Sequence, residues 1–414
     1  MIARGVVLGV HGGLARARIP CARFGDVVRL GARPFVVSGE ICSVDGECVL
    51  IAVHGSVDGI ARGTPVVYDP AAARAVLGCA ALGRALDAHG RPIDGGLPLT
   101  GRRALVSVQP PLPHERVESA EPQWTGLRAI DGLLTLARGA RIGVFGAPGA
   151  GKSTLLENVV AWSSAEAVVV GLVGERGREA RRWIDARPKH ATIVCATSDR
   201  PATERARAAM LAAAAAASLR ERGLHVLFVL DSLARVAAAW REIFVAAGES
   251  VGRGGYPPRV FAELARLVEV AGITRSGSIT LVATVLSDGD ERDPVSDAAR
   301  SLLDGHIVLS APLAQAGRFP AIDPLLSASR TMSAVASPAH VRAAACVRGA
   351  LALLERSADA RRVGIEPVDD LARRAIDAEP RIETFLRQVD RPASPVETFA
   401  ALTQLADSIE PPPR

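Results

Sequence analysis

The sequence predicts an α/β protein whose central parallel sheet follows a small N-terminal β-barrel and precedes a helical C-terminal domain. Three observations predict this order. Short β-rich stretches alternate with glycine turns up to about residue 70. Apolar strands then alternate with helical stretches, which is typical of a parallel sheet covered on both faces. Beyond about residue 341, only Ala, Leu, Arg and Glu at helical spacing remain. We therefore expect domains at 1–70, 71–340 and 341–414.

The N-terminal stretches are short and closely spaced, which indicates a small antiparallel barrel. Its expected strands are residues 5–10, 27–30, 35–37, 49–53 and 65–68. The central sheet is expected from six apolar runs, at residues 142–145, 168–173, 192–196, 226–230, 279–285 and 306–309. The uncharged, alanine-rich run 208–219 predicts a tightly packed helix, because it is too short for a membrane span and is flanked by Arg207 and Arg220.

Composition and charge narrow the function classes. The 414 residues are 49% hydrophobic, which is enough for a sizeable core. The formal net charge is only +5, with both signs interspersed, so nothing favours a nucleic-acid partner. Because the first four residues run directly into strand-like sequence, we expect no signal peptide. The six cysteines show neither metal spacing nor a compact disulfide framework. We therefore expect reduced thiols and a cytoplasmic protein.

A phosphate-binding loop is the most informative motif in the chain. Its residues are Gly146-Ala147-Pro148-Gly149-Ala150-Gly151-Lys152-Ser153-Thr154, between an expected strand at 141–145 and an expected helix at 155–162. In this Walker A pattern the backbone N–H groups cradle phosphates, Lys152 reaches the β- and γ-phosphates, and the Ser153 hydroxyl holds Mg²⁺. All but two of the 49 basic side chains are arginines. A lysine at this position therefore indicates a specific need for a slim ammonium.

A second acidic position follows a later strand. Residues 227–230 are apolar and end in Asp231, where the Walker B carboxylate that completes the Mg²⁺ shell is found in P-loop enzymes. Arg235 stands one helical turn beyond it.

The catalytic carboxylate is expected after the strand at 168–173, within Gly174-Glu175-Arg176-Gly177-Arg178-Glu179. An acid at this strand end can polarise an attacking water, and Arg176 can bind a γ-phosphate. From the residues alone, Glu175 and Glu179 both qualify, and the spacing does not decide between them.

An ordered series of motifs resembles the type III secretion and flagellar export ATPases, which are related to the catalytic subunits of rotary ATP synthases. The series includes the 174–179 motif, Leu230-Asp231-Ser232-Leu233-Ala234-Arg235, Gly255-Tyr256-Pro257-Pro258, Leu303-Asp304-Gly305-His306 and Phe319-Pro320-Ala321-Ile322-Asp323. The match is dense from about residue 83 to 330. This resemblance implies a RecA-like core between the barrel and the helical domain.

Residue roles carry over from the resemblance position by position. Glu175 takes the place of the catalytic carboxylate, and Arg176 and Arg235 those of phosphate ligands. Phe319 stands where an aromatic ring stacks on adenine. Arg330 takes the place of the arginine finger that a neighbouring subunit supplies, although it lies well after the last expected strand.

The resemblance further implies an ATPase that uses ATP and Mg²⁺ to energise protein export, releasing chaperones and unfolding cargo. The implied partners are identical subunits in a hexameric ring, stator and central stalk proteins, and chaperone–effector complexes at the inner membrane. A flagellar export ATPase is the nearest alternative.

Two further alternatives belong to other classes. A non-catalytic ring subunit would keep the Walker A loop but lose the carboxylate at Glu175. A hexameric RNA helicase would need a platform of aromatic and basic residues in the barrel. The only aromatic residues in 1–70 are Phe24, Phe35 and Tyr68.

Overall fold

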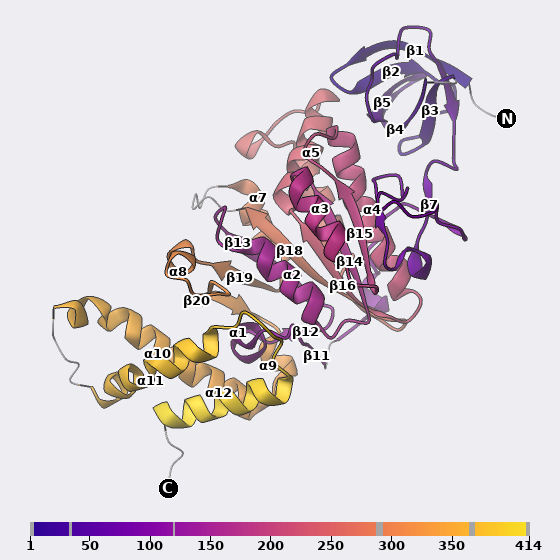
Figure 1. Cartoon of the computed structure of the whole chain (residues 1–414). Helices are drawn as coiled ribbons and strands as arrows, with labels where there is room; N and C mark the ends of the chain where they lie inside the picture. Colours follow the sequence, from indigo (N-terminus) through magenta and orange to yellow (C-terminus); the bar gives the residue numbers. More distant parts are fainter. Residues whose placement is uncertain (1–3, 33–34, 119–120, 287–292, 364–368, 411–414) are drawn as a thin grey trace.

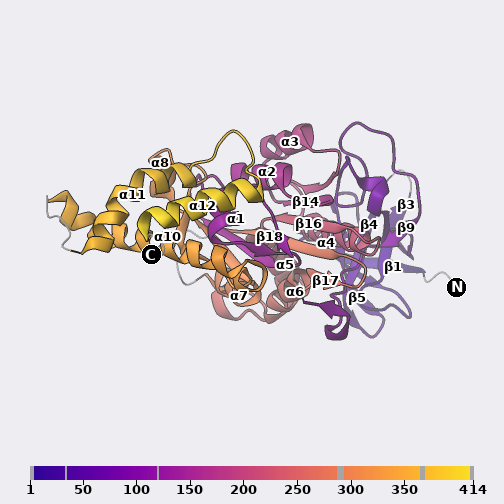
Figure 2. The same cartoon turned by 90° about the horizontal axis from the view of Figure 1, so that it is seen from below.

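The computed structural model describes residues 4–32, 35–118, 121–286, 293–363 and 369–410, and the statements below concern these residues. A barrel, a helix-covered sheet and a helical C-terminal domain follow one another along the molecule, with the barrel and the helices at opposite ends (Figures 1 and 2). The fold class expected from the sequence is thereby confirmed.

Six antiparallel strands close the N-terminal barrel in the order β1-β2-β5-β4-β3-β6. Their bounds are β1 Arg4–His11, β2 Leu14–Arg18, β3 Val27–Ala32, β4 Phe35–Asp45, β5 Cys48–His54 and β6 Pro65–Tyr68. Alternating residues such as Leu30, Ile51 and Val53 fill the interior. Strand β2 was not expected, because its sequence Leu-Ala-Arg-Ala-Arg lacks the β-branched and aromatic residues that mark strands.

Short elements connect the barrel to the central sheet. Strand β8 (Ala85–Leu86) pairs with β15 (Ala191–Ala196) at one side of that sheet. Strand β10 (Arg116–Val117) pairs with β17 (Gly272–Thr274), which in turn pairs with β18 (Ser278–Leu286) of the sheet. The remaining connecting elements are β7 Arg74–Val76, η1 Gly78–Ala81, β9 Arg103–Leu105, η2 Pro113–Glu115, β11 Pro122–Gln123, α1 Arg128–Leu133 and β12 Leu136–Ala137.

The central sheet runs in the order β20-β19-β13-β18-β16-β14-β15-β8. All six expected strands are present and parallel: β13 Arg141–Gly146, β14 Ala167–Val173, β15 Ala191–Ala196, β16 His225–Asp231, β18 Ser278–Leu286 and β19 Gly305–Leu309.

The sheet is not parallel throughout, since β17 and β20 (Ile322–Ser329) are antiparallel to their neighbours. Strand β20 corrects the expectation that Arg330 lies well after the last strand, because the strand ends at Ser329. Its sequence Ile-Asp-Pro-Leu-Leu-Ser-Ala-Ser contains a proline, which weakens the strand signal and which only an edge strand tolerates.

Helices cover both faces of the sheet. Val169 and Phe228 pack in one core with α4 to α7, and Val168 and Val229 pack in a second core with α1 to α3 and the C-terminal helices. The bounds are α2 Lys152–Trp162, α3 Gly177–Ala186, α4 Ala202–Arg220, α5 Leu233–Ala246, η3 Arg253–Gly255, α6 Pro258–Val268, α7 Pro294–Leu302, α8 Ala311–Gln315 and α9 Met332–Val335. The alanine-rich run lies in α4 with residues 211–216 buried, as expected for close packing.

The C-terminal domain consists of α10 Pro338–Arg362, α11 Asp370–Leu386 and α12 Pro395–Ile409. It packs on α1, where a Cβ on Gly132 would lie 2.8 Å from the ring of Phe385, so the two elements approach as closely as a glycine permits. The division at residues 70 and 340 stays a proposal. In the described part of the chain, every helix is too short or too polar to span a membrane.

Candidate active site

The expected site residues lie along one edge of the central sheet. Strands β13, β16 and β14 are parallel, so the loops that follow them leave the sheet at the same edge. The phosphate loop follows β13, Asp231 ends β16, and Glu175 comes two residues after β14. The register confirms the proximity of these ends, because Leu172 of β14 lies opposite Asp231. Ligands of open parallel sheets bind at this edge.

The phosphate loop has the backbone that its glycines allow. Gly149 (φ 82°) and Gly151 (φ 89°) are both in the left-handed region, and Gly151 is the N-cap of α2. The Lys152 ammonium lies over the loop and donates to the carbonyls of Gly146 and Ala147, the latter at 2.9 Å. The N-terminus of α2 therefore lies beside a cation, and both features suit an anion.

A cavity of about 470 Å³ opens in front of this loop. Its volume lies in the usual range for small-molecule sites. Ten of the residues expected at the site from sequence line it: Pro148, Gly149, Gly151, Lys152, Ser153, Thr154, Glu175, Arg176, Asp231 and Arg235. Glu157, Glu179, Arg182 and Trp183 complete the lining.

The two expected carboxylates are both buried in the cavity wall. Glu175 is 6% exposed and forms an ion pair with Arg235. Asp231 is 7% exposed and accepts a hydrogen bond from the Thr284 hydroxyl of β18. Burial raises the pKa of Asp231, although Thr284, Arg235 and Lys152 oppose the shift. The site therefore holds two acids whose ionisation depends on the cations around them.

Glu175 is the more buried of the two candidate acids that follow β14. Burial, the Asp231 charge and Glu179 together raise the pKa of Glu175 to about 8, against the lowering effect of Arg235. The backbone carbonyl of Glu175 accepts from Ser198 N at 3.0 Å, which holds the residue against the loop after β15. Glu179 lies one turn into α3 and is only half-buried. A buried acid with a pKa near neutrality is suited to general-base chemistry.

Sequence reasoning missed an ion pair at the mouth of the cavity. Arg182 of α3 donates to both carboxylate oxygens of Glu157 on α2, at 2.5 and 2.6 Å. The pair joins the helix that begins with Lys152 to the helix that follows Glu175. Neither residue belongs to a recognisable motif, so only the pairing of distant helices identifies them. Thr284 was missed for the same reason.

Five expected residues lie outside the cavity lining, namely Gly146, Ala147 and Ala150 of the phosphate loop, Phe319 and Arg330. Phe319 is beside the phosphate loop, where its ring would lie 3.8 Å from a Cβ placed on Gly151, and 39% of it is exposed. Arg330 follows β20 with an exposed side chain, and its N–H donates to the Asp304 carbonyl at 3.0 Å. Arg330 is thus exposed and does not line the cavity of its own chain.

The residues present fit a nucleotide with Mg²⁺. Among the described residues no group of three or more His, Cys, Asp or Glu side chains could hold a metal ion by itself. Mg²⁺ commonly takes only one or two protein ligands together with substrate phosphates and water. The Ser153 hydroxyl and the buried Asp231 carboxylate, both in the wall of the cavity, match that donor set.

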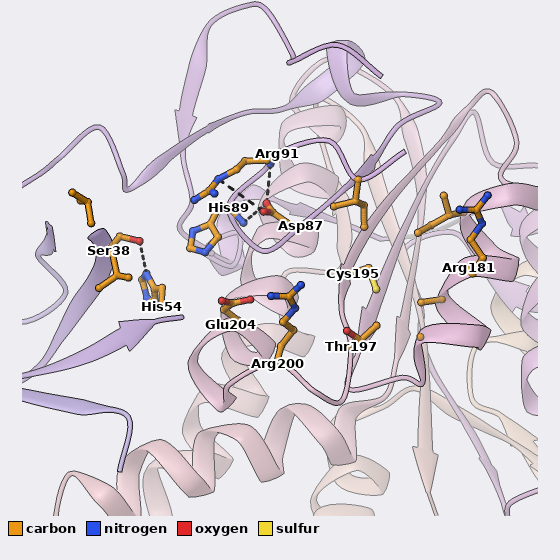
Figure 3. A pocket seen from close by; sticks show the side chains of 16 residues that line it. Ser38, His54, Asp87, His89, Arg91, Arg181, Cys195, Thr197, Arg200 and Glu204 are labelled. Atoms are coloured by element: carbon orange, nitrogen blue, oxygen red, sulfur yellow. Dashed lines mark hydrogen bonds and ion pairs between the residues drawn. The ribbon is translucent and has the colours of Figure 1, made fainter. Parts of the chain in front are cut away.

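A second cavity, of about 460 Å³, lies between the barrel and the sheet domain (Figure 3). His54 from the barrel and His89 from the connecting segment face each other there, with ring centroids 6.0 Å apart. Burial and the nearby Arg207 lower the pKa of both, that of His89 to about 4. This cavity contains none of the residues expected at the site.

Known proteins are similar to this one over almost the whole chain. The family model "ATP synthase alpha/beta family, nucleotide-binding domain" matches residues 126–329. The chain is 41% identical to the type 3 secretion system ATPase of Pseudomonas syringae pv. syringae, covering 98% of this chain and 94% of that protein. It is 38% identical to the flagellum-specific ATP synthase of Bacillus subtilis, covering 98% and 96%.

Solved structures agree with these relatives. The assembled ATPase EscN from the type III secretion system of enteropathogenic E. coli superposes with a TM-score of 0.91 at 37% identity, over 97% of this chain and all of that one. The same ATPase in complex with its central stalk EscO gives a TM-score of 0.90.

Proposed function

Because this chain belongs to the family of type 3 secretion system ATPases and flagellum-specific ATP synthases, it is a P-loop ATPase, and we propose that its ATP hydrolysis energises protein export through a type III secretion apparatus. The supporting observation is the single cavity that brings together the phosphate loop, Asp231 and the buried Glu175. Chaperone release and cargo unfolding at the cytoplasmic base of the apparatus are the work proposed for it.

Phosphate binding is assigned to the residues of the loop and two arginines. The loop N–H groups and the Lys152 ammonium would hold the β- and γ-phosphates. Arg176 and Arg235 line the same cavity and would neutralise the γ-phosphate charge as it develops. Mg²⁺, held by Ser153 and Asp231, would supply further charge neutralisation on the phosphates.

Water activation is assigned to Glu175. Its carboxylate lies in the cavity wall, and its pKa of about 8 allows it to take up a proton during turnover near neutral pH. The ion pair with Arg235 holds the carboxylate on the cavity side. A buried acid at this position also supports a catalytic subunit over the non-catalytic ring subunit, which would lack it.

The proposed site is completed by a neighbouring copy of the chain. Arg330 is exposed and outside its own cavity, which suits a finger that reaches the γ-phosphate of an adjacent subunit. EscN is described as an assembled ATPase, and we propose that this protein likewise assembles, as a ring of six subunits. Fingers of this kind accelerate hydrolysis by roughly 10³–10⁵-fold.

The partners are proposed by analogy with the relatives. EscN has been solved in complex with its central stalk EscO, and we propose an equivalent stalk protein for this chain. The other proposed partners are stator proteins and chaperone–effector complexes. The proposed location is the cytoplasm, with the protein peripherally associated with the inner membrane. No nucleic-acid partner is proposed.

Deletion of the gene with complementation tests the biological role. A strain carrying Lys152→Ala should fail to secrete type III substrates, whereas wild-type complementation restores secretion. The flagellar alternative predicts loss of motility and of flagellar filament export instead. Secretion that persists in the Lys152→Ala strain would refute the proposed role in export, but it would not bear on the assignment of the protein as an ATPase.

A further inference from the structure

The segment that carries Phe319 is held in place by the C-terminal domain. It connects α8 to β20 and has no regular structure of its own. Its backbone is fixed instead by a hydrogen bond from Gln388 N, just beyond α11, to the Phe319 carbonyl at 2.9 Å. The ring therefore lies beside Gly151 of the phosphate loop, while the backbone of Phe319 is held by the helical domain.

An ion pair between the buried Arg318 and the partly exposed Glu383 makes a second attachment. Arg318 is 7% exposed, and its Nη1 lies 3.0 Å from the Glu383 carboxylate of α11. Its Nη2 donates to the Ile322 carbonyl at the start of β20, at 2.9 Å. The guanidinium thus joins α11 to both ends of the short stretch that contains Phe319. A charge this deeply buried requires its partner.

Gln388 also ties this arrangement to the chain that leads toward the phosphate loop. Its side-chain carbonyl accepts from Arg128 N at 2.8 Å, and its amide donates to the Gly126 and Arg391 carbonyls at 2.7 and 2.9 Å. The amide is buried and all its hydrogen bonds are made within the fold. Gln388 therefore fixes the end of α11 against the start of α1 while its backbone holds Phe319.

We propose that Arg318, Glu383 and Gln388 are positioning residues for the adenine site, so that the C-terminal domain sets how well the Phe319 ring stacks on the base. This proposal rests on the assignment of Phe319 as the adenine-stacking residue. The three residues act through Phe319 and contact no phosphate ligand. Their loss should weaken recognition of the base and leave phosphate binding and the chemical step unchanged.

Steady-state hydrolysis by the full-length protein tests the proposal. We expect Glu383→Ala and Gln388→Ala to raise KM for ATP about three- to tenfold, a part of what loss of a stacked ring costs, with kcat close to wild type. Glu383→Gln keeps an oxygen that can accept from Arg318 and should largely restore KM. Inorganic tripolyphosphate, which lacks a base, should inhibit all variants with an unchanged inhibition constant.

Glu379→Ala is the matched control. Glu379 is on the same helix and pairs with Arg361 of α10 at 2.6 Å, so its loss also breaks an ion pair of α11 but leaves the Phe319 segment untouched. KM should stay at the wild-type value in this variant. Thermal melting of each variant, measured alongside, checks that the helical domain remains folded.

The outcomes separate this inference from the function on which it rests. If Phe319→Ala raises KM but Glu383→Ala and Gln388→Ala do not, the positioning role is refuted and the adenine site stands. If Phe319→Ala itself leaves KM unchanged, the adenine assignment is wrong. If Glu383→Ala or the Glu379→Ala control raises the inhibition constant of tripolyphosphate by the same factor as KM for ATP, the substitution disturbs the whole site and not the adenine site alone. The inference is then also refuted.

Discussion

The ionisation of Glu175 gives the sharpest test of the proposed chemistry. With a pKa of about 8 in the nucleotide-free protein, roughly one molecule in ten carries an ionised Glu175 at pH 7. If the ionised form is required, kcat/KM should rise about tenfold from pH 6 to pH 7 and level off above about pH 8, because kcat/KM reports the free enzyme.

Two substitutions should move this midpoint in opposite directions. Arg235 lowers the pKa of Glu175 and Glu179 raises it. Arg235→Ala should therefore shift the midpoint of the kcat/KM profile upward, and Glu179→Gln should shift it downward, each by about one pH unit. Loss of a phosphate ligand changes the height of the Arg235→Ala profile, so only the midpoint is compared.

The assay is phosphate release at subsaturating ATP and saturating Mg²⁺ between pH 5.5 and 9, in buffers of constant ionic strength. Titration of ATP itself is common to all variants, so the shifts between variants isolate the protein group. A midpoint that is identical in wild type, Arg235→Ala and Glu179→Gln would refute Glu175 as the titrating base. A wild-type profile that is flat above pH 5.5 would do the same.

Four further outcomes follow from the site and the barrel interface. The folded protein holds the Glu175 proton up to about pH 8 while the unfolded chain releases it near pH 4.5, so the free energy of unfolding should fall as pH rises through this window. Urea unfolding of Glu175→Gln should show greater stability than wild type at pH 8 and little difference at pH 5. Lys152→Ala should bind Mg·ATP weakly, whereas Glu175→Gln should bind it normally and not hydrolyse it; calorimetric titration distinguishes the two, and hydrolysis by Glu175→Gln would contradict the assignment. Arg330→Ala should bind ATP, assemble and fail to hydrolyse, yet regain part of its activity when mixed with Glu175→Gln, since some interfaces then carry both groups; inactive mixed rings would exclude a finger acting between subunits. His89, whose pKa of about 4 is held down by burial and Arg207, should protonate on unfolding below pH 6.5 and cost about 2 kcal/mol of stability between pH 7 and pH 5. His89→Gln should remove that loss, and an unchanged loss would place the acid sensitivity elsewhere.

Much of the fold could be predicted because its signals are local. The six parallel strands are mostly apolar, and each is a continuous run in the sequence. Strands β2 and β20 were missed because their sequences carry small or polar residues and, in β20, a proline. Such strands are determined by pairing with their neighbours, β1 and β5 for β2 and β19 for β20, and not by their own residues.

The site could be predicted to the extent that its residues are contiguous. Nine consecutive residues specify the phosphate loop, because the glycine positions decide which backbone the loop can adopt. From the residues alone the choice between Glu175 and Glu179 stayed open, since both follow the same strand at distances that a loop could bring to the cavity, and only the family resemblance favoured Glu175. Their difference in burial, and the pairing of Glu175 with Arg235, arise from side chains on separate strands and helices.

The sequence by itself determined the class of reaction, because the phosphate loop and the acids that follow apolar strands are encoded in short segments whose backbone geometry their own residues dictate. Only the tertiary structure decided how those groups are tuned and held. The Asp231–Thr284 contact, the Glu157–Arg182 pair and the attachment of Phe319 to α11 join segments that lie far apart along the chain. Their physical effect depends on burial and distance, which no stretch of sequence contains.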